Sequence, residues 1–410
     1  TVSPARPAFQ PGEYGDSAAR RRNWFRRERD IAISMANVKP LAAAASLLTP
    51  STRSNVPPFM VMDVMAAAAR IEASGGHVIH MEVGQPAASA PTCALAAAHA
   101  AIDAGRIDYT SALGIPSLRA RIARHYHETY RCALDPERIV VTTGSSGAFI
   151  LAFLALFEPG DRVAVTVPGY PPYRHVLTAL GCEPVLIETR SEDRHALTGE
   201  MLLAAHRRAP LKGVLVASPA NPTGTMMSSE ALSSLMAAAD SAGIRIISDE
   251  IYHGLDYAFP AVTAAALSPD AVVINSFSKY FCMTGWRVGW MVVPDRLVRP
   301  IERLQQNLAI SVPTLSQIAA EAAFEGRTEM DAVRHGYQEN RQILIEGLPK
   351  AGLDRFLPAD GAFYLYADVS RFCDDSFVFA SRMLEEAHVA ATPGIDFDPI
   401  HGRAFIRFSY

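Results

Sequence analysis

Paired cysteines, a long apolar run and an excess of one charge are all missing from this sequence. Its five cysteines are scattered, with no C-x-x-C pair, which argues against a disulfide framework or a zinc cluster and favours a reducing cytoplasm. The longest apolar run, residues 148–157, is too short to cross a bilayer. The formal net charge of −4 gives no basic field for nucleic acid. We therefore expect a soluble cytoplasmic protein with no metal site and no membrane or nucleic-acid partner.

The first part of the chain differs from the rest. Residues 1–55 hold six arginines between Arg20 and Arg29, then alanines and prolines, with no periodic apolar face. This composition predicts a disordered leader. An export signal is the alternative, and the short apolar stretch 41–48 disfavours it. The sequence starts with Thr1, so we also expect Met35 as a candidate native start.

An orderly pattern begins near Val61, where apolar spacing predicts a helix that ends at Gly75-Gly76. Short β-branched runs then alternate with helical stretches such as 228–242. The strands we expect are 139–143, 162–167, 185–188, 213–217, 244–248 and 271–276. This alternation predicts an α/β fold with a mostly parallel sheet. Ligands of such sheets bind at the carboxyl ends of the strands.

A third region starts near Pro313 and includes the expected strands 362–367 and 405–409. We predict a small α+β domain from residues 56–84 and 314–410. Residues 85–313 are then the large domain, and a cleft between the two is the expected place for a ligand.

The segment after the last large-domain strand holds Ser276, Lys279 and Arg287. Together these residue types could surround an aldehyde that carries a phosphate. The lysine amine would form an imine, and the serine and arginine would bind the phosphate. A solvated surface lysine is the ordinary alternative.

Polar residues also follow two other strands. Asp249 could pair with a protonated pyridine nitrogen, and Tyr252 and Asn221 could hydrogen-bond the hydroxyl of that ring. A helix-capping aspartate and a tight Asn-Pro turn are the alternatives.

Three further features suit the same ligand. Gly144-Ser145-Ser146 opens an apolar helix, whose free N–H groups could bind a phosphate. Tyr170 could stack on a flat ring. Arg407, in an alternating strand, could clasp a carboxylate with two hydrogen bonds. A plain glycine-rich turn, a core aromatic and a solvent-facing arginine are the alternatives.

In order and spacing these motifs resemble the class I/II aminotransferases, enzymes of fold type I that depend on pyridoxal 5'-phosphate. The resemblance runs from about Pro57 to the end and is carried by SFSKYFCMTGWRVG, ASPANPTG, SDEIY, YTSALGIPSLR and FIRFS. It implies a large domain with a mostly parallel seven-stranded sheet between helices, and a smaller α+β domain. It also implies ping-pong transfer of an amino group between an L-amino acid and a 2-oxo acid.

The resemblance further implies a role for each matching residue. Lys279 is similar to the lysine that forms the Schiff base and moves the α-proton, and Asp249 to the partner of the pyridinium nitrogen. Asn221 and Tyr252 resemble the pair on the ring hydroxyl. The remaining matches are Ser276, Arg287, Gly144, Ser145 and Ser146 for the phosphate, Tyr170 for ring stacking, Arg407 for the substrate α-carboxylate, Gly84 over the substrate, and Tyr109 for the phosphate of a neighbouring subunit. The last match implies a homodimer with shared active sites.

Three departures bear on substrate and stability. The phosphate turn has Ser146 where some dicarboxylate-specific relatives have a lysine, so a neutral or aromatic substrate is at least as well supported. Phe397 is followed by Asp398 and not by glycine, so we expect a different loop there. The family continues with a final helix after the strand that ends near Tyr410. We therefore expect either a truncated sequence or a small domain with an exposed apolar face.

Two other functions remain open. A carbon–sulfur β-lyase or a racemase could use the same lysine and aspartate, because these reactions start from the same carbanion. A transcription regulator is the second alternative, because some regulators join an aminotransferase-like domain to a DNA-binding domain. The leader shows no helix-turn-helix pattern, which disfavours this alternative.

Overall fold

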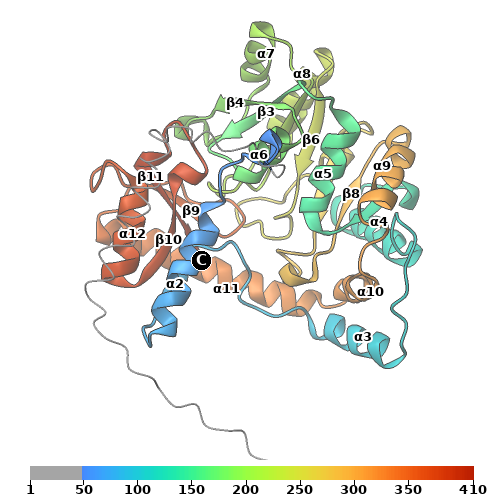
Figure 1. The fold of residues 1–410 in the computed structure, drawn as a ribbon, viewed down its shortest axis with the longest axis horizontal. Coiled ribbons are helices and arrows are strands. Elements are labelled where there is room, and N and C mark those ends of the chain that lie inside the picture. The colour runs from blue at the N-terminus through green and yellow to red at the C-terminus, as the bar shows by residue number, and fades with distance from the viewer. Residues whose placement is uncertain (1–48) are drawn as a thin grey trace, which may run out of the picture. The chain divides into compact units, whose positions relative to one another are not determined.

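Two β-sheets organise residues 49–410, the part of the chain that the computed structural model describes (Figure 1). The predictions of a disordered leader, an export signal and a start at Met35 fall on residues 1–48 almost entirely, outside the described part. Residues Thr52–Tyr410 form one compact unit. None of the helices in the described residues is long and apolar enough to span a membrane.

The larger sheet has seven strands and is mostly parallel, as predicted. In spatial order they are β2 (Ile139–Thr142), β8 (Gly289–Val292), β7 (Val272–Ser276), β6 (Arg245–Asp249), β5 (Gly213–Ala217), β3 (Arg162–Val167) and β4 (Glu183–Glu188). Strand β8 alone runs against the others, between β2 and β7. Six of the seven strands lie within two residues of the predicted ranges, whereas β8 was not among them.

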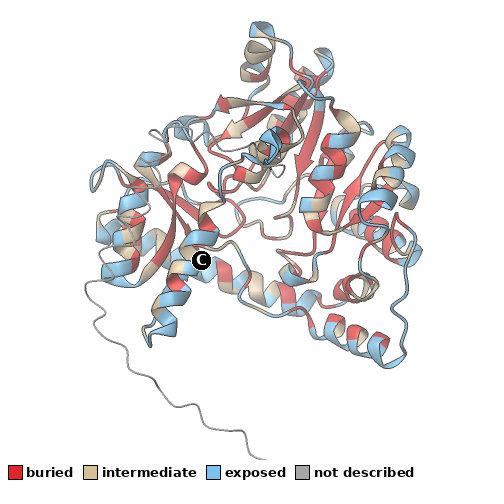
Figure 2. Ribbon diagram, viewed as in Figure 1, coloured by how far each residue is buried: buried red, intermediate tan, exposed pale blue. Residues whose placement is uncertain are grey.

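Side chains alternate between the two faces of this sheet, and both faces are buried (Figure 2). Ile139 and Val141 join one core, whereas Val140 joins the other. A strand buried on both sides needs apolar residues at consecutive positions. This explains why the β-branched runs were visible in the sequence.

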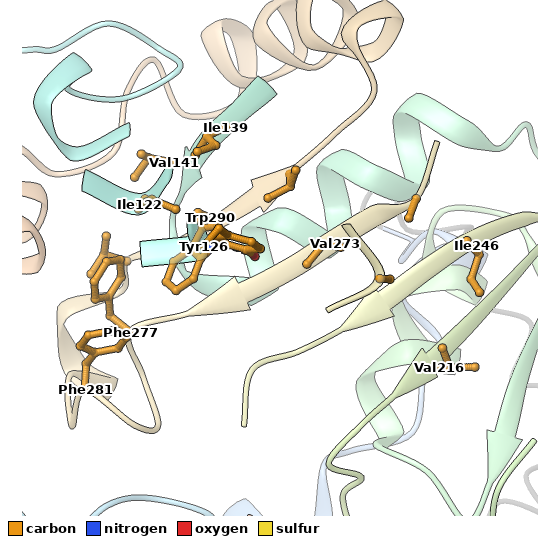
Figure 3. Packing of buried hydrophobic residues seen from close by; sticks show 14 of the residues in the cluster. Ile122, Tyr126, Ile139, Val141, Val216, Ile246, Val273, Phe277, Phe281 and Trp290 are labelled. Carbon is orange, nitrogen blue, oxygen red and sulfur yellow. Dashed lines mark hydrogen bonds between the residues drawn. The ribbon is translucent and has the colours of Figure 1, made fainter. Parts of the chain in front are cut away.

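Aromatic packing dominates one of these cores near β7 and β8 (Figure 3). Phe277 lies between Phe281 and Trp290, with ring centroids 4.8 and 5.0 Å away. The Trp290 indole N–H donates to the Tyr126 hydroxyl at 3.2 Å. Because Phe277 directly follows β7, these contacts fix the chain just after Ser276.

Helices cover both faces of the sheet, and three of those described begin at a side-chain cap, from Thr198, Ser228 and Asp375. Helix α8 starts after Ser228, whose hydroxyl accepts the N–H of Ala231, and ends before Gly243, where φ is +66°. This confirms the helix predicted at 228–242. The helices are α2 (Met60–Ala73), α3 (Thr92–Asp103), α4 (Pro116–Tyr130), α5 (Gly144–Leu156), α6 (Pro171–Ala179), α7 (Gly199–Arg208), α8 (Ser229–Ser241), α9 (Asp295–Leu308), α10 (Thr314–Ala323), α11 (Arg327–Gly347) and α12 (Ser376–Ala387).

The smaller sheet joins the two ends of the described chain. Its order is β1 (Ile79–Met81), β10 (Val389–Pro393), β11 (Phe405–Ser409) and β9 (Tyr364–Asp368). Strand β1 pairs in parallel with β10, with Met81 opposite Ala391. All four strands fall within the segments predicted for the small domain, and the domain boundaries themselves stay a prediction.

Candidate active site

Lys279 lies three residues beyond β7, among residues from distant parts of the chain. Its Nζ donates a hydrogen bond to the carbonyl of Gly84. The same nitrogen lies 5.8 Å from the ring centroid of Tyr252. Burial, with the charges of Arg407 and Arg287, lowers the pKa of Lys279 to about 8. About a tenth of this amine is therefore neutral and nucleophilic at pH 7, far more than for an ordinary lysine.

Asp249 is the last residue of β6 and is buried. Its Oδ1 accepts the N–H of Ile251 at 3.0 Å, and its Oδ2 accepts a hydrogen bond from the Tyr173 hydroxyl. Burial raises the pKa of Asp249 to about 6, and these hydrogen bonds oppose the rise. Tyr173 was not predicted. Its place three residues after Tyr170, in the first turn of α6, was the signal that could have revealed it.

Two buried tyrosine hydroxyls meet beside Lys279. Tyr252 and Tyr364 lie 2.6 Å apart, oxygen to oxygen. Burial raises the pKa of both phenols, so both keep their protons. Tyr364, on β9, was not predicted, because only the fold brings it to a residue 112 positions earlier.

Arg407 points inward from β11 and is only 1% exposed, so the solvent-facing alternative is wrong. Its Nη1 donates to Asn221 Oδ1 at 3.0 Å, and its Nη2 donates to the carbonyl of Glu82. The guanidinium lies between two aromatic rings, 4.5 Å from the centroid of Tyr364 and 4.7 Å from that of Phe397. Its Nε has no hydrogen-bond partner among the described residues.

The residues predicted to hold a phosphate come together at the start of α5. A β-carbon added at Gly144, where φ is +68°, would lie 2.8 Å from Nη2 of Arg287. One added at Gly289, which pairs with Ser276, would lie 3.1 Å from the backbone nitrogen of Ser145. The Arg287 guanidinium, Ser276 and the first N–H groups of α5 therefore lie close to one another. This set of hydrogen-bond donors suits an anion. Ser146, the next residue of α5, is exposed.

Tyr170 immediately precedes α6 and packs edge-on against two rings. Its centroid lies 5.2 Å from that of Tyr173 and 5.8 Å from that of Phe59. Phe59, which the sequence did not indicate, precedes α2. Tyr109 differs from the other predicted site residues, because its side chain is 81% exposed.

The unusual Asp398 has a structural reason. Its Oδ1 accepts the N–H groups of Ile400 at 2.8 Å and His401 at 3.0 Å. A buried carboxylate with two backbone donors holds a tight turn. The aspartate therefore stabilises the loop that carries Phe397 under Arg407.

Taken together, the site holds a partly neutral amine, a buried carboxylate, an anion cradle and a buried guanidinium. No group of three or more metal-ligating side chains gathers in residues 49–410. An amine can form an imine with an aldehyde, and a guanidinium can bind a carboxylate. The arrangement therefore suits covalent chemistry on a carboxylate-bearing substrate.

Known proteins are similar to this chain in sequence and in fold. The family model "Aminotransferase class I and II" matches residues 76–410. Valine–pyruvate aminotransferase of Mycobacterium tuberculosis is 49% identical over 362 residues, which are 87% of this chain and 93% of that protein.

Solved structures agree with the family match. An aminotransferase from Mycobacterium tuberculosis superposes with a TM-score of 0.86 at 48% identity, over 88% of this chain and 94% of that one. Aspartate aminotransferase from Thermus thermophilus, solved with maleate, gives 0.83 at 30% identity, over 89% and 95%. The chain therefore belongs to the class I and II aminotransferases, and it is an aminotransferase with the fold that aspartate aminotransferase has.

Proposed function

We propose that this aminotransferase uses pyridoxal 5'-phosphate and Lys279 to exchange an amino group between a neutral L-amino acid and a 2-oxo acid. The observation that carries the proposal is the position of the Lys279 amine. It is partly buried near the charges of Arg407, Arg287 and Asp249, and its pKa is lowered to about 8. A lysine in these surroundings is suited to react with an aldehyde.

The residues present fit the proposed cofactor at each of its polar groups. The cradle formed by Arg287, Gly144 and Ser145 suits its phosphate. Asp249 suits a protonated pyridine nitrogen, since each of its oxygens accepts one hydrogen bond from the protein and keeps a lone pair. Tyr252 keeps its proton and can donate to the ring hydroxyl.

When bound, pyridoxal phosphate supplies an aldehyde for the amino group and a protonated ring that disperses the negative charge left at the α-carbon. Arg407 is proposed to bind the substrate carboxylate, and the Tyr364 and Phe397 rings on either side hold the orientation of its guanidinium. Asp249 keeps the ring nitrogen protonated. With the cofactor bound, the neutral Nζ of Lys279 would accept the proton of the substrate α-carbon. It would return this proton to the cofactor carbon on the other side of the transferred nitrogen.

The substrate side chain is proposed to be neutral. Arg287 and Arg407, the cations whose charges lower the pKa of Lys279, each have another role in the proposal, and Ser146 brings no charge to the phosphate turn. The relative at 49% identity is a valine–pyruvate aminotransferase. We therefore take valine as the first donor and pyruvate as the first acceptor.

Shared sites in a homodimer are also part of the proposal. The exposure of Tyr109 supports it, because a tyrosine that serves a neighbouring subunit stands free in the single chain. Exposed apolar side chains that a partner could cover are Ile102, Ile107, Ile150, Leu154, Leu308 and Ile310. We propose the cytoplasm as the location, which the unpaired cysteines support.

A panel of single amino acids tests the proposed function. The purified holoenzyme is mixed with valine, aspartate, phenylalanine or cystathionine in separate cuvettes, and the visible band of the cofactor is recorded. We expect valine to bleach the band and leave the corresponding 2-oxo acid, with aspartate much less effective. Bleaching by aspartate alone would contradict the neutral-substrate proposal. Pyruvate, ammonia and homocysteine released from cystathionine, without bleaching, would support the β-lyase.

The pH dependence of cofactor uptake tests the state of Lys279. Only the neutral amine reacts, so the rate constant for uptake by the apoenzyme should rise about tenfold per pH unit below the pKa. With that pKa near 8, the rate should level off above about pH 9. The control is a lysine model peptide, whose rate should climb until its own pKa near 10.4. A profile for the protein that follows the peptide would contradict the assignment.

A further inference from the structure

Tyr173 contacts two residues to which the proposed function gives roles, yet has no role itself. We propose that Tyr173 is a positioning residue that keeps Asp249 ionised and thereby keeps the nitrogen of the cofactor ring protonated. This inference rests on the proposed use of pyridoxal phosphate.

The hydrogen bond joins two separate elements. Tyr173 lies in the first turn of α6 and Asp249 at the end of β6, and both side chains are buried. The Tyr173 hydroxyl donates to Oδ2, whereas Oδ1 accepts the N–H of Ile251. In the described part of the chain Tyr173 is the only side chain that donates a hydrogen bond to this carboxylate. A donor to a carboxylate favours the ionised form.

The surroundings make this one hydrogen bond important. Burial raises the pKa of Asp249 to about 6, within about one unit of neutral pH. The charge of Lys279 acts in the opposite direction, through space. Glu250, the neighbouring carboxyl, has its pKa raised to about 8 by burial and is therefore mostly uncharged at pH 7. The hydroxyl of Tyr173 thus helps to decide whether Asp249 carries its charge.

The ring of Tyr173 makes a second, separable contact. It packs edge-on against Tyr170, with centroids 5.2 Å apart, and lies 5.1 Å from the ring of Phe149. Tyr170 is the aromatic residue proposed to stack on the cofactor. Tyr173→Phe removes only the hydroxyl and should keep both ring contacts, so it tests the hydrogen bond alone.

The experiment compares three holoenzymes: wild type, Tyr173→Phe and Tyr366→Phe. Tyr366 is a buried tyrosine of β9 whose hydroxyl donates only a long hydrogen bond, 3.5 Å, to the carbonyl of Gly394. It therefore controls for the loss of any buried phenol oxygen. Three quantities are measured: the cofactor dissociation constant, kcat and KM for valine, and the ¹⁵N NMR signal of ring-labelled cofactor.

For Tyr173→Phe we expect the ring nitrogen signal to move from pyridinium toward neutral pyridine. The cofactor dissociation constant should rise and kcat should fall, each about tenfold, the size expected for one hydrogen bond to a charged group. KM for valine should stay within about twofold, because Arg407 is untouched. Tyr366→Phe should resemble wild type in all three measurements.

The outcomes separate this inference from the proposed function. A wild type that neither binds the cofactor nor transaminates would overturn both. A functional wild type with an unchanged nitrogen signal in Tyr173→Phe would overturn the inference alone, even if kcat falls, since the role would then be structural. Equal losses of cofactor affinity and kcat in Tyr173→Phe and Tyr366→Phe would also overturn the inference.

Discussion

Lys279→Ala is expected to lower kcat for transamination by about 10⁴-fold, the upper range for loss of a group that transfers a proton. The side chain is the only one proposed both to hold the cofactor covalently and to move the α-proton. Its amine makes one hydrogen bond, to the carbonyl of Gly84, so the substitution removes little else that holds the fold. The protein should therefore fold and still bind the cofactor through the phosphate cradle.

Lys350→Ala is the matched control, because Lys350 is exposed in the turn after α11. It should leave kcat unchanged. Single-turnover kinetics and the thermal midpoint, measured on both variants, separate lost chemistry from lost stability. More than a tenth of wild-type kcat remaining in Lys279→Ala would refute the assignment.

Arg407→Lys is expected to lower kcat/KM for valine by about 10²–10³-fold. Lysine keeps the charge but not the two parallel N–H donors, and truncated buried charge pairs typically lose about 2–5 kcal/mol. The lysine ammonium also fits less well between the Tyr364 and Phe397 rings, which lie 4.5 and 4.7 Å from the guanidinium carbon.

An amine without a carboxylate sharpens this test. Isobutylamine resembles valine but lacks the group that Arg407 is proposed to bind, so its slow reaction should be nearly equal in wild type and Arg407→Lys. The control is Arg403→Lys, whose exposed guanidinium pairs with Asp375 at 2.8 Å. If Arg407→Lys lowers kcat/KM for valine and for isobutylamine by the same factor, Arg407 has a structural role and does not bind the carboxylate.

The sequence indicated the central strands because they are buried on both faces, as Val163 and Ala164 show. Strand β8 escaped prediction. Its four residues follow a glycine-containing segment, and their strand state depends on pairing with β2 and β7 on either side. Pairing of this kind is set by the fold and leaves no local pattern.

The site residues also divide into those with a local sequence pattern and those whose role depends on the fold. Asp249 and Lys279 were predictable because they end or closely follow strands, where ligands of parallel sheets bind. Tyr173, Tyr364 and Phe397 were not, since their importance lies in contacts with residues far away in the sequence. Sequence patterns therefore found the residues proposed to react, and the structure added those that hold them.

The parallel pairing of β1 with β10 has a consequence for how the enzyme is made. Met81 and Ala391 face each other across about 310 residues of chain. At roughly 5–20 residues per second, the ribosome needs about 15–60 s to pass from one strand to the other. Gly84 and Arg407 lie next to or within this sheet, so the site cannot assemble before β10 and β11 have been synthesised. Until then the edge of β1 stays unpaired in the nascent chain, where chaperones can bind it.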